Sequence, residues 1–163
     1  MNDNYAVING KRVELTDEQL KALGIKKTNP FERVETHDYY YYVRDDNRVD
    51  VYTDINDMVD KTMYNVSNYF NDRDFANQVA LHQLLYRKLL KFAYDNGCED
   101  NREWDGDNEH WCIYYGCRSE QFDTTFHTCA NHFGVYFSSD EAAECAIKEV
   151  VEPFMKEHPD FVW

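Results

Sequence analysis

The longest stretch of regularly spaced hydrophobic residues runs from Asn71 to Gly97 and predicts an amphipathic helix. Asn71 is placed to cap the first free amide groups, and Gly97 supplies a left-handed stop. The apolar arc, which should face a core, holds Phe75, Val79, Leu81, His82, Leu85, Tyr86, Leu89, Leu90, Phe92 and Ala93. Leu84 instead projects from the polar arc, which indicates a helix face that touches a partner or a second copy.

The start of the chain predicts a small unit made of a β-hairpin and a short helix. Two short apolar runs flank Asn9-Gly10, the strongest short signal for a two-residue hairpin turn. Thr16 and Gln19 then form the capping box of a short helix. That helix should turn Leu20 and Leu23 toward a core.

The chain therefore divides into a hairpin-helix unit, residues 1–27, and a main domain, residues 30–163, with a linker closing at Pro30. A unit of about 25 residues cannot hold a core by itself. We expect it to dock on the main domain, on a neighbouring subunit or on a partner.

Apolar runs before the long helix predict strands at 38–43 and 49–53, joined by a turn at Asp45–Asn47. Residues 54–61 carry three Asp without periodicity and predict a loop, and residues 63–70 predict a third strand. These strands would lead directly into the long helix.

Three more strands are predicted after the long helix, at 110–115, 122–130 and 134–137. A second helix opens with Ser138 as the cap and Glu141 three residues later, and Pro153 ends or bends it. Its inner face holds Ala142, Ala146, Ile147, Val150 and Phe154. The apolar end of the chain, residues 161–163, should pack.

Hairpin strands followed by helices predict an α+β fold, in which an antiparallel sheet carries two main helices on one face. The segment Tyr69–Ala76 aligns with Tyr136–Ala143, and each lies at a strand-to-helix junction. A duplicated β-β-β-α unit and convergence on a good helix-start sequence explain this similarity equally well.

The charge of the chain limits the kinds of partner. Its 163 residues carry 17 basic and 31 acidic side chains, a formal charge of −14, which argues against direct binding to DNA phosphates. Five cysteines at irregular spacing and no apolar leader segment indicate reduced thiols and a cytoplasmic protein. No apolar run reaches the roughly 18 residues of a membrane span, so we expect no membrane partner.

Two acidic segments are the first candidates for a binding site. Seven carboxylates lie between Asp95 and Glu109, and six between Asp45 and Asp60. Such a density could imitate the phosphates of a nucleic acid and occupy a basic channel, although solvated loops would look the same. The candidate partner-binding residues are Asp45, Asp46, Asp50, Asp95, Glu99, Asp100, Glu103, Asp105, Asp107 and Glu109.

A second candidate interface combines Leu84 with the tyrosine strand, where Tyr40 and Tyr42 are expected to be exposed. Exposed tyrosines are also ordinary residues of a strand. His82 lies in the apolar arc of the long helix, where a core or edge histidine is the ordinary explanation.

Metal sites fit the sequence less well. Residues 105–109 begin like a calcium loop, but His110 and Gly116 stand where Gly and Glu are required. The same acids would suit magnesium in a nuclease, without an accompanying motif. A hairpin centred near Ser119 would bring four residues to one face of the sheet: His110, Cys112, His127 and Cys129. These residues could bind zinc or supply a Cys-His nucleophile, and a partly buried polar cluster is the alternative. We expect no metal and no cofactor.

Four stretches carry a resemblance to known proteins: YAVINGKRVELTDEQLKALGI, YYYYV, NYFNDRDFA and VYFSSDEAAECAI. They resemble a loosely defined group of small proteins encoded by phages and mobile elements of Gram-positive bacteria. Members of such sets include anti-CRISPR and other anti-defence proteins, several of which cover a nucleic-acid site with acidic surface. The shared motifs are structural, so no catalytic residue is carried over, and the basic face of the long helix departs from a pure mimic.

The resemblance implies a non-enzymatic inhibitor of a host defence protein with a basic nucleic-acid channel, with a CRISPR effector as the leading candidate. The competing hypotheses are an enzyme that acts on nucleic acid or on a defence signalling ligand, and a regulatory or structural phage protein that works as a homodimer.

Overall fold

The computed structural model describes residues 5–8, 11–24 and 29–163. The chain folds into two compact units. The first unit contains the residues up to Tyr42 and Val51–Arg73, and the second contains Val43–Asp50 and Asp74–Trp163. The division into residues 1–27 and 30–163 stays a prediction.

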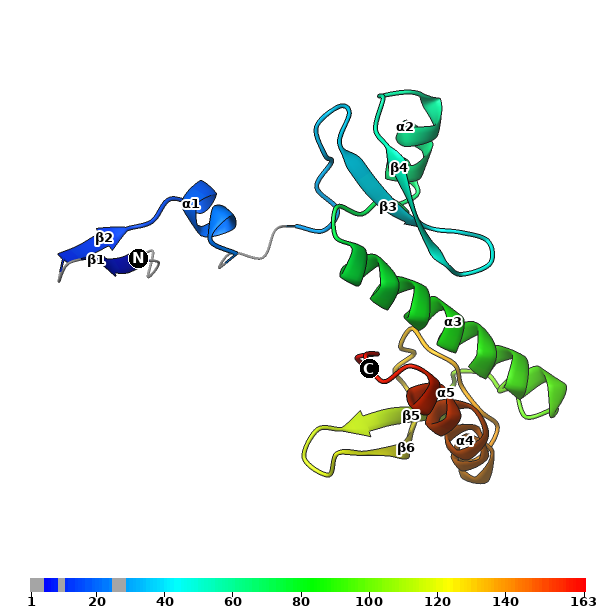
Figure 1. Ribbon diagram of the computed structural model, residues 1–163. Coiled ribbons are helices and arrows are strands. Elements are labelled where there is room, and N and C mark those ends of the chain that lie inside the picture. The colour runs from blue at the N-terminus through cyan, green and yellow to red at the C-terminus, as the bar shows by residue number, and fades with distance from the viewer. Residues whose placement is uncertain (1–4, 9–10, 25–28) are drawn as a thin grey trace. The chain divides into compact units, whose positions relative to one another are not determined.

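The predicted α+β class is confirmed, and the strands pair antiparallel (Figure 1). Across the described residues these pairs form three separate two-stranded sheets, β1-β2, β3-β4 and β5-β6. The strands are β1 (Tyr5–Ile8), β2 (Lys11–Glu14), β3 (Tyr39–Val43), β4 (Val49–Thr53), β5 (His110–Gly116) and β6 (Gln121–His127). The helices are α1 (Asp17–Ala22), α2 (Met58–Asn65), α3 (Arg73–Asp95), α4 (Asp140–Ala146), a π-helical turn η1 (Ile147–Val151) and α5 (Glu152–Glu157).

The N-terminal hairpin and helix form as predicted. β1 and β2 pair antiparallel, while the predicted turn at Asn9-Gly10 lies outside the described residues. The capping box is confirmed, because Gln19 N donates to Thr16 Oγ1 and Thr16 N donates to Gln19 Oε1. Leu20 is buried, but 60% of Leu23 is exposed. The inward placement of Leu23 was wrong because α1 ends at Ala22.

The segment predicted as a loop, residues 54–61, instead leads into helix α2. Asp57 is its N-cap and accepts hydrogen bonds from the backbone of Val59 and Asp60, while the Asp60 side chain completes the capping box. The predicted strand at 63–70 is also wrong, because only Phe70 pairs, in a single bridge with Tyr41. The aspartates that suggested a solvated loop thus start a helix.

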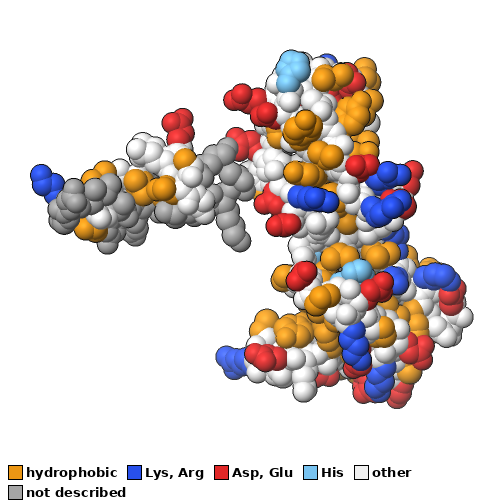
Figure 2. All heavy atoms as spheres, viewed as in Figure 1, with side chains coloured by type: hydrophobic (Ala, Val, Ile, Leu, Met, Phe, Trp, Pro, Cys, Tyr) orange, Lys and Arg blue, Asp and Glu red, His pale blue; other side chains and the backbone are white. Residues whose placement is uncertain are grey.

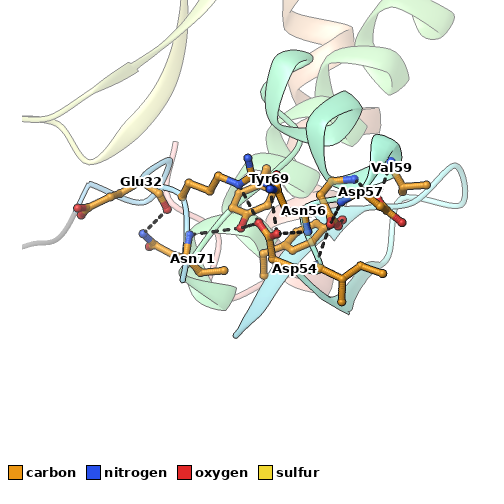
Figure 3. A network of polar contacts seen from close by, with 12 residues as sticks. Glu32, Asp54, Asn56, Asp57, Val59, Tyr69 and Asn71 are labelled. Carbon is orange, nitrogen blue, oxygen red and sulfur yellow. Dashed lines mark hydrogen bonds and ion pairs between the residues drawn. The ribbon is translucent and has the colours of Figure 1, made fainter. Parts of the chain in front are cut away.

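A buried polar network holds the first unit together (Figure 3). Asp54 is 1% exposed and accepts hydrogen bonds from Arg33 Nε at 2.8 Å and from the Tyr69 hydroxyl at 2.8 Å. Asp60, also buried, accepts from the Tyr40 hydroxyl, whose ring stacks on Tyr69 with centroids 4.0 Å apart. The hydrogen bonds from Arg33 lower the pKa of Asp54 to about 2, although burial opposes the charged form.

Helix α3 begins two residues after the predicted cap. The side-chain nitrogen of Asn71 donates to the carbonyls of Asn29 and Glu32, each at 2.9 Å, and its side-chain oxygen has no partner among the described residues. Asn71 therefore joins the chain before β3 to the start of α3 instead of capping the helix. The C-terminal end of α3 is as predicted, because Gly97 has the left-handed conformation, with φ 61°.

The buried stripe of α3 consists of Ala76, Ala80, Leu85, Leu89 and Ala93. Three of these residues are alanines, so the stripe is narrower than the predicted arc and shifted around the helix. Leu84 is half-buried and packs against the core of the second unit, and Leu90 is 37% exposed. The predicted orientations of Leu84 and Leu90 were therefore wrong.

The second unit packs α3, α4, η1 and α5 around one apolar core. Ala143 and Val151 belong to this core, beside the predicted Ala146, Ile147 and Phe154. The π-helical turn η1 comes directly before α5, in which Pro153 lies in the first turn, so the helical path continues past the proline. Phe161 is buried, whereas Val162 and Trp163 are exposed.

The cap of α4 lies one residue later than predicted. Ser139 is the N-cap, and its hydroxyl accepts from Ala142 N at 3.2 Å. The predicted strand at 134–137 is reduced to Phe137, which bridges Trp111 and Glu99. Phe70 and Phe137 are thus both buried bridge residues that precede a helix, but the duplicated unit stays a prediction.

Candidate functional site

The acidic segment before β5 is folded around a buried carboxylate. Asp100 accepts hydrogen bonds from Arg102 Nε at 2.9 Å and from Arg102 N at 3.1 Å. Its second oxygen lies 2.6 Å from His110 Nδ1, and both of these side chains are 1% exposed. Burial opposes the charge, but the hydrogen bonds of Arg102 and His110 outweigh it and lower the pKa of Asp100. The expected exposure of Asp100 was therefore wrong.

Aromatic rings cover the Asp100–His110 pair. The indole of Trp104 stacks on His110 with centroids 3.6 Å apart and planes at 10°, and Tyr136 packs edge-on against Trp104 at 5.1 Å. His110 Nε2 is buried without a hydrogen-bond partner in the described structure. A substrate cannot reach this nitrogen, so the pair fixes the loop and does not form an open catalytic site.

Asp105 builds the tip of the same loop. Its side chain accepts from the backbone nitrogens of Asp107 at 2.9 Å and Asn108 at 3.0 Å, and these bonds lower the pKa of Asp105. Asn108 donates in turn to the carbonyl of Glu103 at 3.1 Å. The loop backbone is thereby tied together from within.

The remaining acidic candidates of this segment fall into two groups. Asp95 pairs with Lys91 one helical turn away, and one oxygen of Glu99 is buried without a hydrogen bond while the other accepts from Asn101. The carboxylates of Glu103, Asp107 and Glu109 are exposed, and no hydrogen bond or ion pair to them is found in the described structure. Of the acidic candidates in this segment, these three are both exposed and without a hydrogen bond or ion pair in the described structure.

The acidic residues of the β3-β4 turn are largely matched by their own arginines. Asp46 pairs with Arg48 and Arg44, and Asp50 pairs with Arg44 at 3.1 Å. Asp45 is exposed. The predicted acidic surface of the turn is thus partly neutralised within the turn itself.

On the face shown in Figure 2, acidic and basic side chains lie interspersed over α4, α5 and the β5-β6 hairpin.

The tyrosine strand faces the opposite way from the prediction. Tyr40 is 1% exposed and Tyr42 is half-buried, while 66% of Tyr39 is exposed. Tyr39 lines a shallow apolar hollow with Val51, Tyr52, Thr53 and Ile55. The expected exposure of Tyr40 was wrong because its hydroxyl bonds to the buried Asp60, and sequence alone could not distinguish the two faces of YYYYV.

The predicted pairing of His110 with His127 across β5 and β6 is confirmed. The four-residue zinc arrangement does not form, because His110 turns to Asp100 and the His127 ring packs on His132 at 4.8 Å. Within the part of the chain that the structure describes, no three His, Cys, Asp or Glu residues are grouped to hold a metal. Burial raises the pKa of the Cys112 thiol, which makes it a poor nucleophile.

A cavity of about 470 Å³ in the second unit was not predicted. It lies among α3, the β5-β6 hairpin, the segment before Phe137 and the end of the chain. Its lining contains no Asp, Glu, Lys or Arg, and consists of His82, Leu85, Tyr86, Leu89, Cys112, Ile113, His127, His132, Phe133, Gly134, Val135, Tyr136, Phe137, Phe161 and Trp163. Three of its lining residues had been singled out in the sequence for other reasons: His82, Cys112 and His127.

Comparisons with protein-family models, with curated proteins and with solved structures found no match to this chain. Among the described residues, no helix combines the length and the apolar composition that a bilayer crossing requires.

Proposed function

We propose that this protein binds a partner protein through Glu103, Asp107 and Glu109 and thereby covers a basic, nucleic-acid-binding channel. The observation that carries the proposal is the contrast between these three exposed carboxylates and the loop that holds them. The loop is fixed by the buried Asp100–His110 pair and by the backbone contacts of Asp105, whereas the three carboxylates make no hydrogen bond or ion pair in the described structure.

A preorganised loop favours association because little conformational entropy remains to be lost when the partner binds. Glu103, Asp107 and Glu109 lie within seven consecutive residues of a chain with a formal charge of −14, so they would also attract a basic surface before contact. The arginines beside Asp46 and Asp50 reduce the negative potential of the β3-β4 turn, so the 103–109 segment is the better site for a cationic partner.

The class of partner follows from the resemblance to phage and mobile-element proteins. Several anti-defence proteins in such sets cover a nucleic-acid site with acidic surface, so a CRISPR effector from a Gram-positive host is the first target to test. An inhibitor by occupancy would saturate near a fixed ratio to its target, and guide or target nucleic acid would compete with it.

The test replaces Glu103, Asp107 and Glu109 together by Lys. The matched control reverses three other exposed carboxylates, Glu35, Glu149 and Glu152, which gives the same change in net charge. We expect the loop variant to lose binding in a pull-down with the purified effector, while the control retains it. Binding of the unmodified protein should weaken as salt shortens the screening length to about 8 Å and below.

Circular dichroism should show that both triple variants remain folded, because exposed charges contribute little to stability. Equal binding by the loop variant and the control would contradict the proposal. Competition by nucleic acid distinguishes occupation of a channel from attachment elsewhere on the effector.

A further inference from the structure

We propose that the cavity of the second unit binds a flat aromatic molecule that carries an acidic group, such as an aromatic carboxylate or sulfonate. This inference is independent of the proposed protein contact, because no residue of the 99–109 loop lines the cavity. It rests on how the cavity is formed, on its apolar walls and on the polar groups that it contains.

The cavity opens where a third strand stops pairing with β5. Phe137 N donates to Trp111 O at 2.8 Å, and Trp111 N donates to Phe137 O at 3.3 Å. In an antiparallel ladder the next such pair would join Val135 to Ile113, but no backbone hydrogen bond between them exists in the described structure. Both residues line the cavity instead.

The departing segment is held in place by a side chain. The hydroxyl of Tyr136 accepts from His132 N at 2.8 Å and donates to His132 O at 3.0 Å. This closed loop keeps residues 132–136 away from β5. The opening is therefore built into the fold, as expected for a largely preformed ligand site.

The walls and rim suit a planar apolar molecule. Leu85, Leu89 and Phe161 are buried side chains of the lining. At the rim, the ring of Phe133 lies parallel to that of Tyr86, with centroids 5.5 Å apart and planes at 9°, yet Phe133 is 96% exposed. A flat ligand would cover this exposed ring, and a volume of about 470 Å³ is within the usual range for small-molecule sites.

The polar groups of the lining favour an acid over a base. Three imidazoles, those of His82, His127 and His132, line the cavity, and no lining carboxylate opposes an anion. His82 Nδ1 lies 2.8 Å from the carbonyl of Gln78 and donates to it, so the neutral ring presents an acceptor at Nε2, and the N–H donors for an acidic group come from His127 and His132. A carboxylate or sulfonate could accept hydrogen bonds from imidazole N–H groups, whereas an ammonium group would find no lining carboxylate to neutralise it.

The test compares two fluorescent probes, 8-anilinonaphthalene-1-sulfonate and N-phenyl-1-naphthylamine, which share their rings and differ in the sulfonate. We expect saturable binding of the sulfonate at one site per chain, and weaker binding of the uncharged probe. Phe133→Ala should weaken both probes roughly three- to tenfold, the range that one aromatic pair accounts for. His132→Phe, at an exposed position, keeps a ring but removes its N–H donor, so it should weaken only the sulfonate.

Phe126→Ala is the matched control, because Phe126 is an exposed aromatic residue of the same unit and does not line the cavity. It should leave both dissociation constants unchanged. Equal effects of Phe126→Ala and Phe133→Ala, or non-saturable binding, would overturn the site. Equal affinity of the unmodified protein for the two probes, or an unchanged affinity of His132→Phe for the sulfonate, would overturn the acidic group as a recognition element.

Discussion

Asp54→Asn tests whether one buried carboxylate stabilises the first unit through its charge. Asparagine keeps the shape of the side chain but removes the negative charge that faces Arg33 Nε at 2.8 Å. The pKa of Asp54 is lowered from 3.8 to about 2 in the fold, which corresponds to about 2 kcal/mol of stability at neutral pH. Arg33 remains one-third exposed and can be solvated, so the loss should fall below the roughly 3 to 5 kcal/mol of a fully buried broken pair.

The sign of the pH dependence follows from the lowered pKa. The stabilisation by Asp54 is fully present above the unfolded-state pKa of 3.8 and is lost as pH falls through the folded-state value of about 2. The stability difference between the unmodified protein and Asp54→Asn should therefore be constant from about pH 5 to 7 and should shrink between about pH 4 and 2.

Urea unfolding followed by far-UV circular dichroism gives the free energy of unfolding at each pH, and hydrogen exchange of peptides from residues 31–72 localises the loss. Asp38→Asn is the control, because Asp38 is an exposed carboxylate of the same unit. It should change the stability by less than about 0.5 kcal/mol. The reasoning fails if Asp54→Asn is equally mild, or if its effect persists unchanged in acid.

Three further predictions concern the second unit, and chemical unfolding measures each. Leu89→Ala should cost about 2 to 5 kcal/mol of stability as a core truncation. Leu84→Ala should cost less, because Leu84 is only half-buried. Equal losses would show that the wrong face of α3 has been assigned to the core. His110→Ala should cost about 3 kcal/mol, since it removes the Trp104 stack and leaves a buried oxygen of Asp100 unpaired. A loss within experimental error would contradict the role of the Asp100–His110 pair in fixing the loop. Ser139→Ala should cost about 1 kcal/mol of stability and Ser138→Ala almost nothing, because Ser139 is the N-cap of α4. A larger loss for Ser138→Ala would instead support Ser138 as the cap, as the sequence predicted.

Local sequence signals were sufficient where a structure depends on neighbours in the chain. The hairpins and the pairing of His110 with His127 follow from strand length and turn position alone. The burial of Asp54 and Asp60 was missed because the partners of these two side chains are distant in the sequence. Arg33 lies 21 residues before Asp54, and Tyr40 lies 20 residues before Asp60, so a solvated loop and a buried network look alike in sequence.

The candidate sites show the same limit. Glu103, Asp107 and Glu109 are exposed as expected, but the burial of Asp100 depends on the pairing that brings His110 beside it. Local signals marked single residues of the cavity but not the cavity itself, because it results from a hydrogen-bond pair that is not made between Val135 and Ile113. A short apolar segment such as 134–137 predicts a strand, and only tertiary packing decides how far that strand stays paired.

The π-helical turn η1 holds one residue more than regular α-helical winding would place there, since Glu152 N donates to Ile147 O five residues back. Removing one residue from 147–151 should restore ordinary winding and leave Phe154 directed into the core. Removing one residue from α4 instead should rotate everything that follows by about 100° around the helix axis. In the helical segment from α4 to α5, η1 is thus a place where one residue can be lost while the side chains that follow still face the core.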